Sequence, residues 1–241
     1  MKPSAKAILA IVATIACAGV AHHLLTWNEG AGPVQPRVKE WIELPPPTDM
    51  DMPLREALQK RRSIREYLPE PIRINQLANI LWAAQGITHG HGFRTAPSAG
   101  ALYPIRVYVV IKKGGVDGLP AGVYVYDPHR HALGLVRTGD VSAPLMRACL
   151  GQEWVGKAPV DIVLVGYESV LRPRYGDRSF RYMAEEAGHI GQNIYLACTA
   201  MGLGTVAVGA FHDDEVKKIL GITAPDAVPL YVFPIGVPAE R

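Results

Sequence analysis

The sequence predicts one α+β domain in which helices flank a central, mostly antiparallel or mixed sheet. Three observations lead to this fold class. Short apolar runs of strand length alternate with stretches of helical periodicity from residue 53 onward. The runs 123–126 and 132–137 lie on either side of Asp127-Pro128, as in a hairpin. The run 160–165 is predominantly apolar, which indicates a buried central strand.

The predicted helices have apolar residues at three- and four-residue spacing. The first begins after Pro53, a residue tolerated at a first helical position. The second has Asn75 as a plausible N-cap. Gly202 ends the longest one. The five expected helices are 54–58, 75–85, 140–150, 180–201 and 213–220.

The predicted strands are rich in valine, isoleucine and tyrosine. They are expected at 107–111, 123–126, 132–137, 160–165, 206–210 and 230–237. The sequence contains no internal repeat. A length of 241 residues, of which 49% are hydrophobic, suits one such domain with an N-terminal extension.

The N-terminal extension differs in composition from the rest of the chain. Lys2 and Lys6 precede an uncharged apolar run at 7–21, as in a secretory signal or membrane anchor at 1–27. This run is shorter than the ~20 residues of a typical span, so cleavage and a retained anchor both remain open. Five prolines mark 28–52 as a linker, and the domain is expected over 53–241. The expected location is exported or membrane-anchored.

Charge and cysteine usage exclude several classes of protein. The net charge is only +3 and the basic residues are dispersed, so no nucleic-acid surface is indicated. Three cysteines without a CxxC or a Cys/His pattern argue against a disulfide scaffold and against a metal site. The Gly202-Leu203-Gly204 turn follows a helix and precedes a strand, the reverse of the order in a Rossmann dinucleotide site.

Three segments carry residues suited to binding a ligand. Arg61, Arg62, Ser63 and Arg65 place guanidinium forks and a hydroxyl together, which matches phosphate oxygens, although a solvated turn has the same composition. The stretch 96–104 is rich in small residues that allow a flat ligand to approach, although an ordinary Pro/Gly turn would also fit. Glycines within 186–193 are costly in a helix, so they indicate close packing against another element, for which the same helix of a partner subunit is one candidate.

In this order and spacing the segments resemble the nitroreductase family, most closely its SagB/ThcOx-type branch of azoline-forming dehydrogenases. The resemblance covers about residues 53–241. It depends on four motifs: Arg-Arg-Ser-Ile-Arg at 61–65, Pro-Ser-Ala-Gly-Ala-Leu-Tyr-Pro at 97–104, Glu-Ala-Gly-His-Ile-Gly-Gln-Asn at 186–193, and Gly-Leu-Gly-Thr at 202–205 followed by Gly-Ala-Phe.

The resemblance implies a nitroreductase-like fold, a homodimer, and an FMN site at the subunit interface. It implies that the first motif grips the FMN phosphate and the polar rim of the ring. It further implies that the second motif reaches the flavin from the partner and that the turn lies against the ring. The residues matched in this way are Arg61, Arg62, Ser63, Arg65, Pro97, Ser98, Ala99, Gly100, Leu203, Gly204 and Thr205, with Arg241 at a position where the family often has a basic contact.

Arg174 and Tyr175 stand about where azoline dehydrogenases have a Lys-Tyr pair associated with proton removal. Arginine stays protonated and cannot act as a base, so this departure counts against azoline formation. Arg174 could instead hold an anionic substrate or orient Tyr175, whose phenol could donate a proton. A purely structural role for Tyr175 is the competing interpretation.

The expected activity is transfer of hydride through bound FMN to a small organic acceptor, such as a nitroaromatic or quinone-like compound, with NAD(P)H as one candidate donor. One alternative is a SagB-type dehydrogenase acting on a peptide or a small molecule. The alternative of another class is a flavin-binding or electron-relay protein without turnover.

Overall fold

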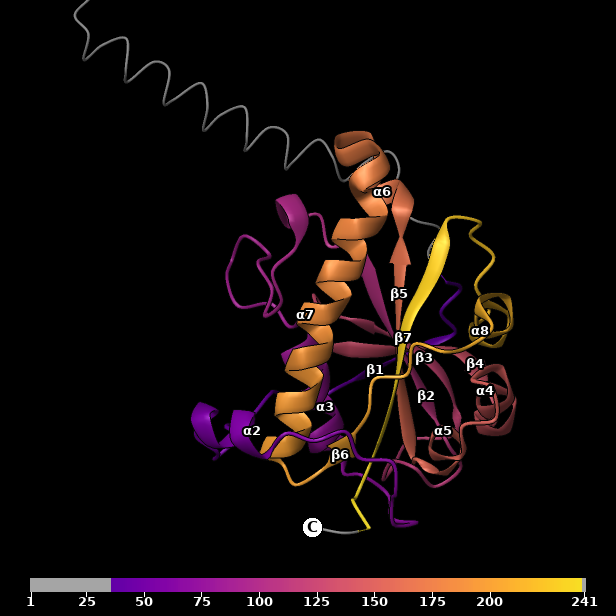
Figure 1. The fold of residues 1–241 in the computed structure, drawn as a ribbon. Coiled ribbons are helices and arrows are strands. Elements are labelled where there is room, and N and C mark those ends of the chain that lie inside the picture. Colours follow the sequence, from indigo (N-terminus) through magenta and orange to yellow (C-terminus); the bar gives the residue numbers. More distant parts are fainter. Residues whose placement is uncertain (1–35, 240–241) are drawn as a thin grey trace, which may run out of the picture. The chain divides into compact units, whose positions relative to one another are not determined.

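Seven strands form one antiparallel sheet in the computed structural model, which describes residues 36–239 (Figure 1). Their spatial order is β1-β4-β3-β2-β5-β7-β6, and every neighbouring pair is antiparallel. This confirms the predicted α+β class. The strands are β1 (Glu40–Glu43), β2 (Ile105–Ile111), β3 (Gly122–Asp127), β4 (Ala132–Thr138), β5 (Val160–Tyr167), β6 (Gly204–Thr205) and β7 (Ala227–Gly236).

The central strand β5 is buried along its whole length between β2 and β7. Its side chains alternate between two cores, as the period of a strand requires. Ile162 and Leu164 belong to one core, whereas Val163 and Val165 belong to the other. Asp161 also lies in this strand, and burial raises the pKa of its carboxyl well above the usual range.

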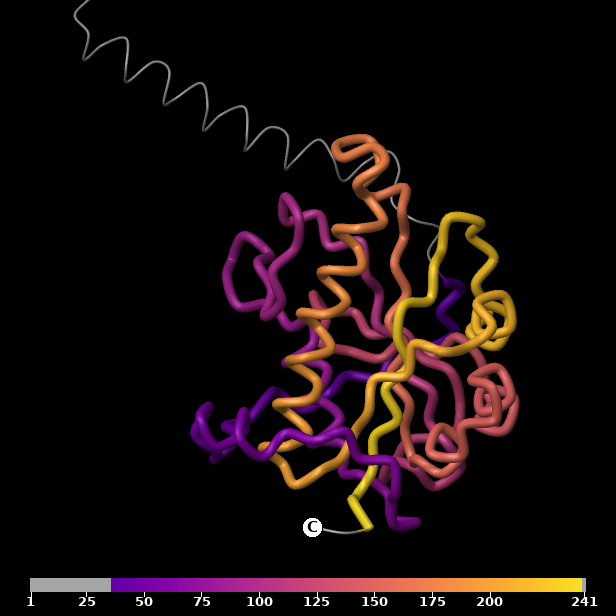
Figure 2. Tube along the Cα trace, viewed as in Figure 1, coloured from indigo at the N-terminus to yellow at the C-terminus, as the bar shows by residue number. Residues whose placement is uncertain are grey.

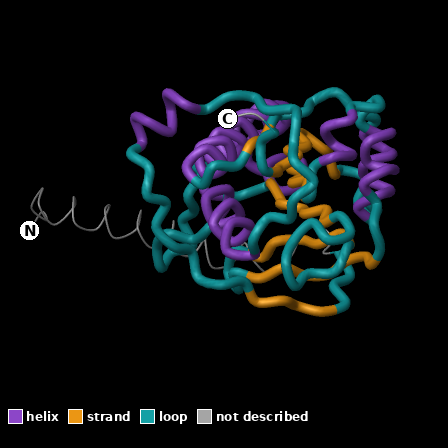
Figure 3. The backbone as a smooth tube through the Cα atoms, turned by 90° about the horizontal axis from the view of Figure 1, so that it is seen from below, coloured by secondary structure: helices purple, strands orange, loops and turns teal. Residues whose placement is uncertain are grey.

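Helices cover both faces of the sheet, so the domain has three layers (Figure 3). The long α7 (Ser179–Ala200) crosses one face together with α3 (Ile74–Gln85), and α2 (Leu54–Lys60) lies against α7. The other face carries α4 (Ser142–Ala148), α5 (Glu153–Lys157) and α8 (Asp213–Leu220). The helix α6 (Glu168–Tyr175) and a short 3-10 turn, Gly176–Arg178, lead into α7.

Close packing of α7 explains one of its two unusual glycines. A Cβ at Gly191 would come within 2.7 Å of the Phe233 ring on β7. The prediction of close packing is therefore confirmed at Gly191. A Cβ at Gly188 would meet nothing within 4 Å in the described chain, so its contact with a partner subunit stays a prediction.

The structure differs from the predicted elements in several places, and the short α5 and β6 were also not expected. Residues 206–210 do not form a strand, because the Ala207 N–H donates to the Tyr195 hydroxyl (2.8 Å) and only Val208 makes an isolated bridge to β7. The helix α6 was not expected. It contains Pro173, and proline usually interrupts a helix. The stretch expected as a linker contributes β1, which pairs with β4.

The predicted exported or membrane-anchored location does not stand. No helix within residues 36–239 is long and apolar enough to cross a membrane. The segment 1–27, on which that prediction depended, lies outside the described residues.

Candidate functional site

The structure joins two of the predicted binding segments at one edge of the sheet. We call residues 61–65 the arginine segment and residues 202–205 the glycine turn. Ser63 pairs with Thr205 in a parallel bridge, and the Ile64 N–H donates to the Thr205 carbonyl at 2.9 Å. A Cβ at Gly204 would lie 2.7 Å from Ile64, so glycine permits this close approach. The two segments therefore form one continuous surface.

Tyr195 of α7 connects the same two segments through its hydroxyl. This hydroxyl lies 3.0 Å from Ser63 Oγ and accepts the Ala207 N–H at 2.8 Å. The Arg61 guanidinium lies 5.0 Å from the centre of the Tyr195 ring, in cation–π geometry. Tyr195 thus fixes where the arginine segment and the chain after the glycine turn meet.

The three arginines of this segment point in different directions. Arg61 lies over Tyr195, and Arg65 lies 5.6 Å from the centre of the Trp154 ring. Arg62 Nη1 donates to the carbonyls of Gln59 (2.9 Å) and Arg61 (2.7 Å). Within the described part of the chain no carboxylate lies within 4.0 Å of any of them. Their positive charge is consequently available to an anion.

A second group of predicted residues lies in the small-residue loop, which we define as residues 97–103. The backbone of this loop is strained. Gly100, Ala101 and Tyr103 all have positive φ, at 62°, 55° and 50°. Non-glycine residues rarely adopt this region, and such residues cluster at functional sites. The Tyr103 N–H donates to Ser98 Oγ at 2.9 Å, which closes the loop on itself.

The small-residue loop touches the candidate proton donor. A Cβ at Gly100 would lie 2.7 Å from Arg174 Nη1 and 2.7 Å from the Tyr175 hydroxyl. The Tyr175 ring also packs edge-on against Tyr182, with centroids 4.9 Å apart. Both predicted catalytic residues therefore border the backbone of Gly100.

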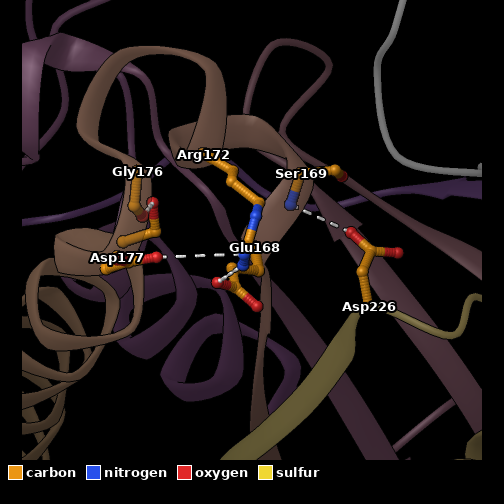
Figure 4. Close-up of polar contacts among 7 residues, drawn as sticks. Glu168, Ser169, Arg172, Gly176, Asp177 and Asp226 are labelled. Atoms are coloured by element: carbon orange, nitrogen blue, oxygen red, sulfur yellow. Dashed lines mark hydrogen bonds and ion pairs between the residues drawn. The ribbon is translucent and has the colours of Figure 1, made fainter.

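Polar contacts fix α6, which carries Arg174 and Tyr175 (Figure 4). Arg172 Nη1 lies 2.5 Å from Glu168, and its Nη2 lies 4.0 Å from Asp177. Asp226 accepts the Ser169 N–H at 3.1 Å, near the positive end of the helix. Such exposed pairs add little stability, but they set the direction of α6. No carboxylate in the described chain lies within 4.0 Å of Arg174.

A buried carboxyl lies behind the small-residue loop. Glu186 of α7 is 1% exposed, and burial raises the pKa of its carboxyl to about 7. The nearby Ser98 hydroxyl, the hydrogen bond from Gln85 and the charge of Arg94 oppose this shift. Burial also lowers the pKa of the Arg94 guanidinium.

The two groups attach to α7 at separate points. Ser98 lies close to Glu186, and Ser63 Oγ hydrogen-bonds to the hydroxyl of Tyr195, nine residues further along. Nine residues advance a helix by about 14 Å and turn it by about 180°. Figure 2 shows the loop before β2 beside the first half of α7, and the arginine segment near the other end of α7. The two groups therefore do not form a single pocket within one chain.

Nearly all the predicted site residues thus fall into two groups. Arg61, Arg62, Ser63 and Arg65 lie with Leu203, Gly204 and Thr205, whereas the loop residues Pro97, Ser98, Ala99 and Gly100 lie with Arg174 and Tyr175. Arg241 lies outside the described residues. Among residues 36–239 no cluster of three or more His, Cys, Asp or Glu side chains could hold a metal ion.

Sequence reasoning missed Tyr195 and Arg94. The helical periodicity of α7 marks Tyr195 only as one more partly apolar residue. Arg94 stands outside the quoted motifs, between the predicted helix at 75–85 and the small-residue stretch at 96–104. The one available signal for Tyr195 was its position two residues after the 186–193 motif. Nothing in the sequence indicated Arg94.

Comparisons with known proteins agree with this architecture. The model described as "Nitroreductase family" matches residues 58–237. MJ1384 of Methanocaldococcus jannaschii, provisionally named a nitroreductase, is 42% identical over 196 residues, covering 81% of this chain and 96% of that protein. A crystal structure from Ralstonia eutropha JMP134, also provisionally named a nitroreductase, has a TM-score of 0.73 at 33% identity, covering 88% of this chain and 97% of that one.

A third comparison concerns the expected likeness to peptide-processing enzymes. The Escherichia coli microcin synthetase McbBCD complex with truncated pro-MccB17 bound gives a TM-score of 0.64 at 23% identity. The match covers 89% of this chain and 80% of that chain. At this identity the similarity shows a shared fold.

Proposed function

Because the chain belongs to the nitroreductase family, a class of oxidoreductases, we propose that it binds FMN and transfers hydride through it to a small organic acceptor. Nitroaromatic and quinone-like compounds are the expected acceptors, and NAD(P)H is one candidate donor. One observation carries the proposal: the arginine segment lies hydrogen-bonded to the glycine turn, and its guanidinium groups have no carboxylate partner in the described chain.

The donor set fits a flavin phosphate. A phosphate carries a charge between −1.5 and −2 at neutral pH, which guanidinium groups neutralise with paired hydrogen bonds. Arg62 and Arg65 are exposed and Ser63 adds a hydroxyl beside them. In addition, Thr205 Oγ1 is buried without a hydrogen-bond partner in the described chain, so the glycine turn retains an unused polar atom.

We expect each site to be completed by a second subunit. The arginine segment and the small-residue loop attach to α7 about 14 Å apart and on opposite sides, so a two-fold axis is needed to bring one of each together. An apolar depression of ≈ 370 Å³ runs along α2, α3 and α7, and Leu54 and Leu58 beside it are 66% and 51% exposed. This surface is suited to a homodimer interface.

The flavin supplies the hydride chemistry, and the chain supplies position and charge. Tyr175 is the residue placed to donate a proton to a reduced acceptor. Arg174, next to it at Gly100, stays protonated and can hold an anionic group of the acceptor. Because Arg174 cannot act as a base, the Arg174–Tyr175 pair supports reduction of an acceptor better than dehydrogenation of a peptide.

Flavin retention tests the phosphate role directly. Full-length protein is incubated with FMN, freed of excess by gel filtration and examined by absorbance. We expect yellow protein that bleaches on reduction. In Arg62→Ala/Arg65→Ala the loss of two charged donors should lower FMN affinity by at least ~10-fold. The matched control Arg137→Ala/Arg147→Ala removes the same charge from exposed residues of β4 and α4. Equal FMN retention in both double variants would overturn the proposal.

Subunit complementation tests the shared site. One variant carries Arg62→Ala/Arg65→Ala and the other Gly100→Ala, so each lacks a different group. Random mixing of subunits should restore about a quarter of the native sites, because half the dimers are mixed and each of those has one intact site. A mixture no more active than its parents, in dimers proven by mass spectrometry to exchange, would contradict a site built from two subunits.

A further inference from the structure

We propose that Glu186 and Arg94 are positioning residues, which hold the small-residue loop against Arg174 and Tyr175 through a ring of buried and partly buried polar contacts. This role rests on the proposed function, because it assumes that the loop contributes to the flavin site. Neither side chain needs to touch flavin or substrate.

The ring can be followed from residue to residue. Arg94 Nη1 donates to Gln85 Oε1 at 2.7 Å, and Gln85 Nε2 donates to Glu186 Oε1 at 3.4 Å. The Glu186 carboxyl lies close to the Ser98 hydroxyl, although Glu186 Oε2 has no hydrogen-bond partner in the described chain. Ser98 Oγ in turn accepts the Tyr103 N–H at 2.9 Å. The Tyr103 hydroxyl accepts the Arg94 N–H at 3.1 Å, which closes the ring.

This ring joins elements that are otherwise separate. Gln85 is the last residue of α3, Glu186 lies in α7, and Tyr103 precedes β2. The Arg94 guanidinium also lies 4.3 Å from the centre of the Tyr103 ring. The loop is thereby held from both of its ends, at Ser98 and at Tyr103.

The loop that the ring holds has a strained backbone. Ala101 and Tyr103 have positive φ, which is unfavourable for residues with a Cβ, so the loop would relax if its ends were released. Relaxation would move Gly100 away from Arg174 and Tyr175, whose atoms it now touches. A carboxyl and a guanidinium bridged by an amide are also costly to bury, which suggests that they are present for geometry and not for stability.

Hydrogen exchange on the flavin-free full chain tests the positioning role. In Glu186→Leu, loss of the carboxyl should lower protection of peptides covering 98–104 by at least ~5-fold, because the Ser98 contact is lost. Glu186→Gln keeps an acceptor oxygen and should restore most of this protection. Glu185→Leu, at the exposed neighbour of Glu186, is the matched control and should leave the loop unchanged.

A double-mutant cycle separates positioning from general destabilisation. Ser98→Ala should add little to Glu186→Leu, because both break the same link of the ring. Additive effects on loop protection would overturn the proposal, as would loss of protection spread evenly over the whole sheet. If Glu186→Leu does not fold, the same cycle is run with Arg94→Met, which breaks the ring at its opposite side.

FMN affinity then tests whether the ring influences the proposed flavin site. Glu186→Leu should weaken FMN binding by ~5-fold or more while Glu186→Gln binds nearly as the native protein does. Unchanged affinity in Glu186→Leu would refute the link to the site. If the native chain itself binds no FMN, the proposed function fails, and the hydrogen-exchange result still decides whether the ring positions the loop.

Discussion

Replacing Glu186 by glutamine should change how the stability of the protein depends on pH. The carboxyl is 1% exposed, and its pKa rises from 4.5 to about 7 in the folded protein because burial disfavours the charged form. Glutamine has nearly the same shape and does not titrate. Comparison of the two proteins therefore isolates the contribution of this one proton.

The sign follows from which state holds the proton. Between pH 4.5 and 7 the folded protein keeps Glu186 protonated, whereas the unfolded chain has released the proton. The free energy of unfolding must then fall as the pH rises through this range. The shift of about 2.5 pKa units corresponds to about 3 kcal/mol at 1.36 kcal/mol per unit. This contribution is fully present below pH 4.5 and absent above pH 7.

Urea unfolding of the full chain at pH 4 and pH 8 measures the effect. Relative to the native protein, Glu186→Gln should be more stable at pH 8 than at pH 4 by about 3 kcal/mol. Glu185→Gln is the matched control, since Glu185 is exposed and pairs with Arg181 at 2.8 Å. If the difference between Glu186→Gln and the native protein is the same at both pH values, the carboxyl does not titrate as argued and the reasoning is refuted.

Two further substitutions probe the small-residue loop and the arginine segment separately. Gly100→Ala should cost more than the ~1–2 kcal/mol of a positive φ, because its Cβ would also displace Tyr175, and acceptor reduction should fall steeply. Gly114→Ala carries a similar φ of 72° in open space and should keep full activity; equal losses in both would contradict the contact argument. Tyr195→Phe should lower stability by ~1–3 kcal/mol and weaken FMN retention, because a backbone N–H loses its acceptor. Tyr231→Phe is its control, because Tyr195 and Tyr231 both pack against the Phe233 ring. Equal melting temperatures for the two variants would contradict a stabilising role of the Tyr195 hydroxyl.

Most of the fold was predictable because it depends on local patterns. The alternation of the hairpin strands and the helical period of α7 are properties of contiguous residues. The elements that were missed depend on single distant contacts or on an exception to a local rule. The Tyr195 hydroxyl draws the chain away from β7 at Ala207, and Pro173 lies in α6 although proline usually interrupts a helix.

The candidate site was predictable in its chemistry and much less so in its arrangement. Guanidinium groups and small residues are recognisable types, so the arginine segment and the small-residue loop could be proposed in advance. Their attachment to α7 at Tyr195 and Glu186 could not, because it depends on which helix face meets which loop. The residues that hold the loop, Arg94 among them, are ordinary polar residues whose importance comes only from their neighbours.

One continuous helix carries both attachment points, and this limits how the chain can vary. Inserting a single residue between Glu186 and Tyr195 would rotate one of them by about 100° relative to the other and would shift the small-residue loop relative to the arginine segment. Loops elsewhere can lengthen at small cost. Among homologues the spacing between these two positions should therefore be invariant, while length differences should collect at exposed turns such as the one around Gly114.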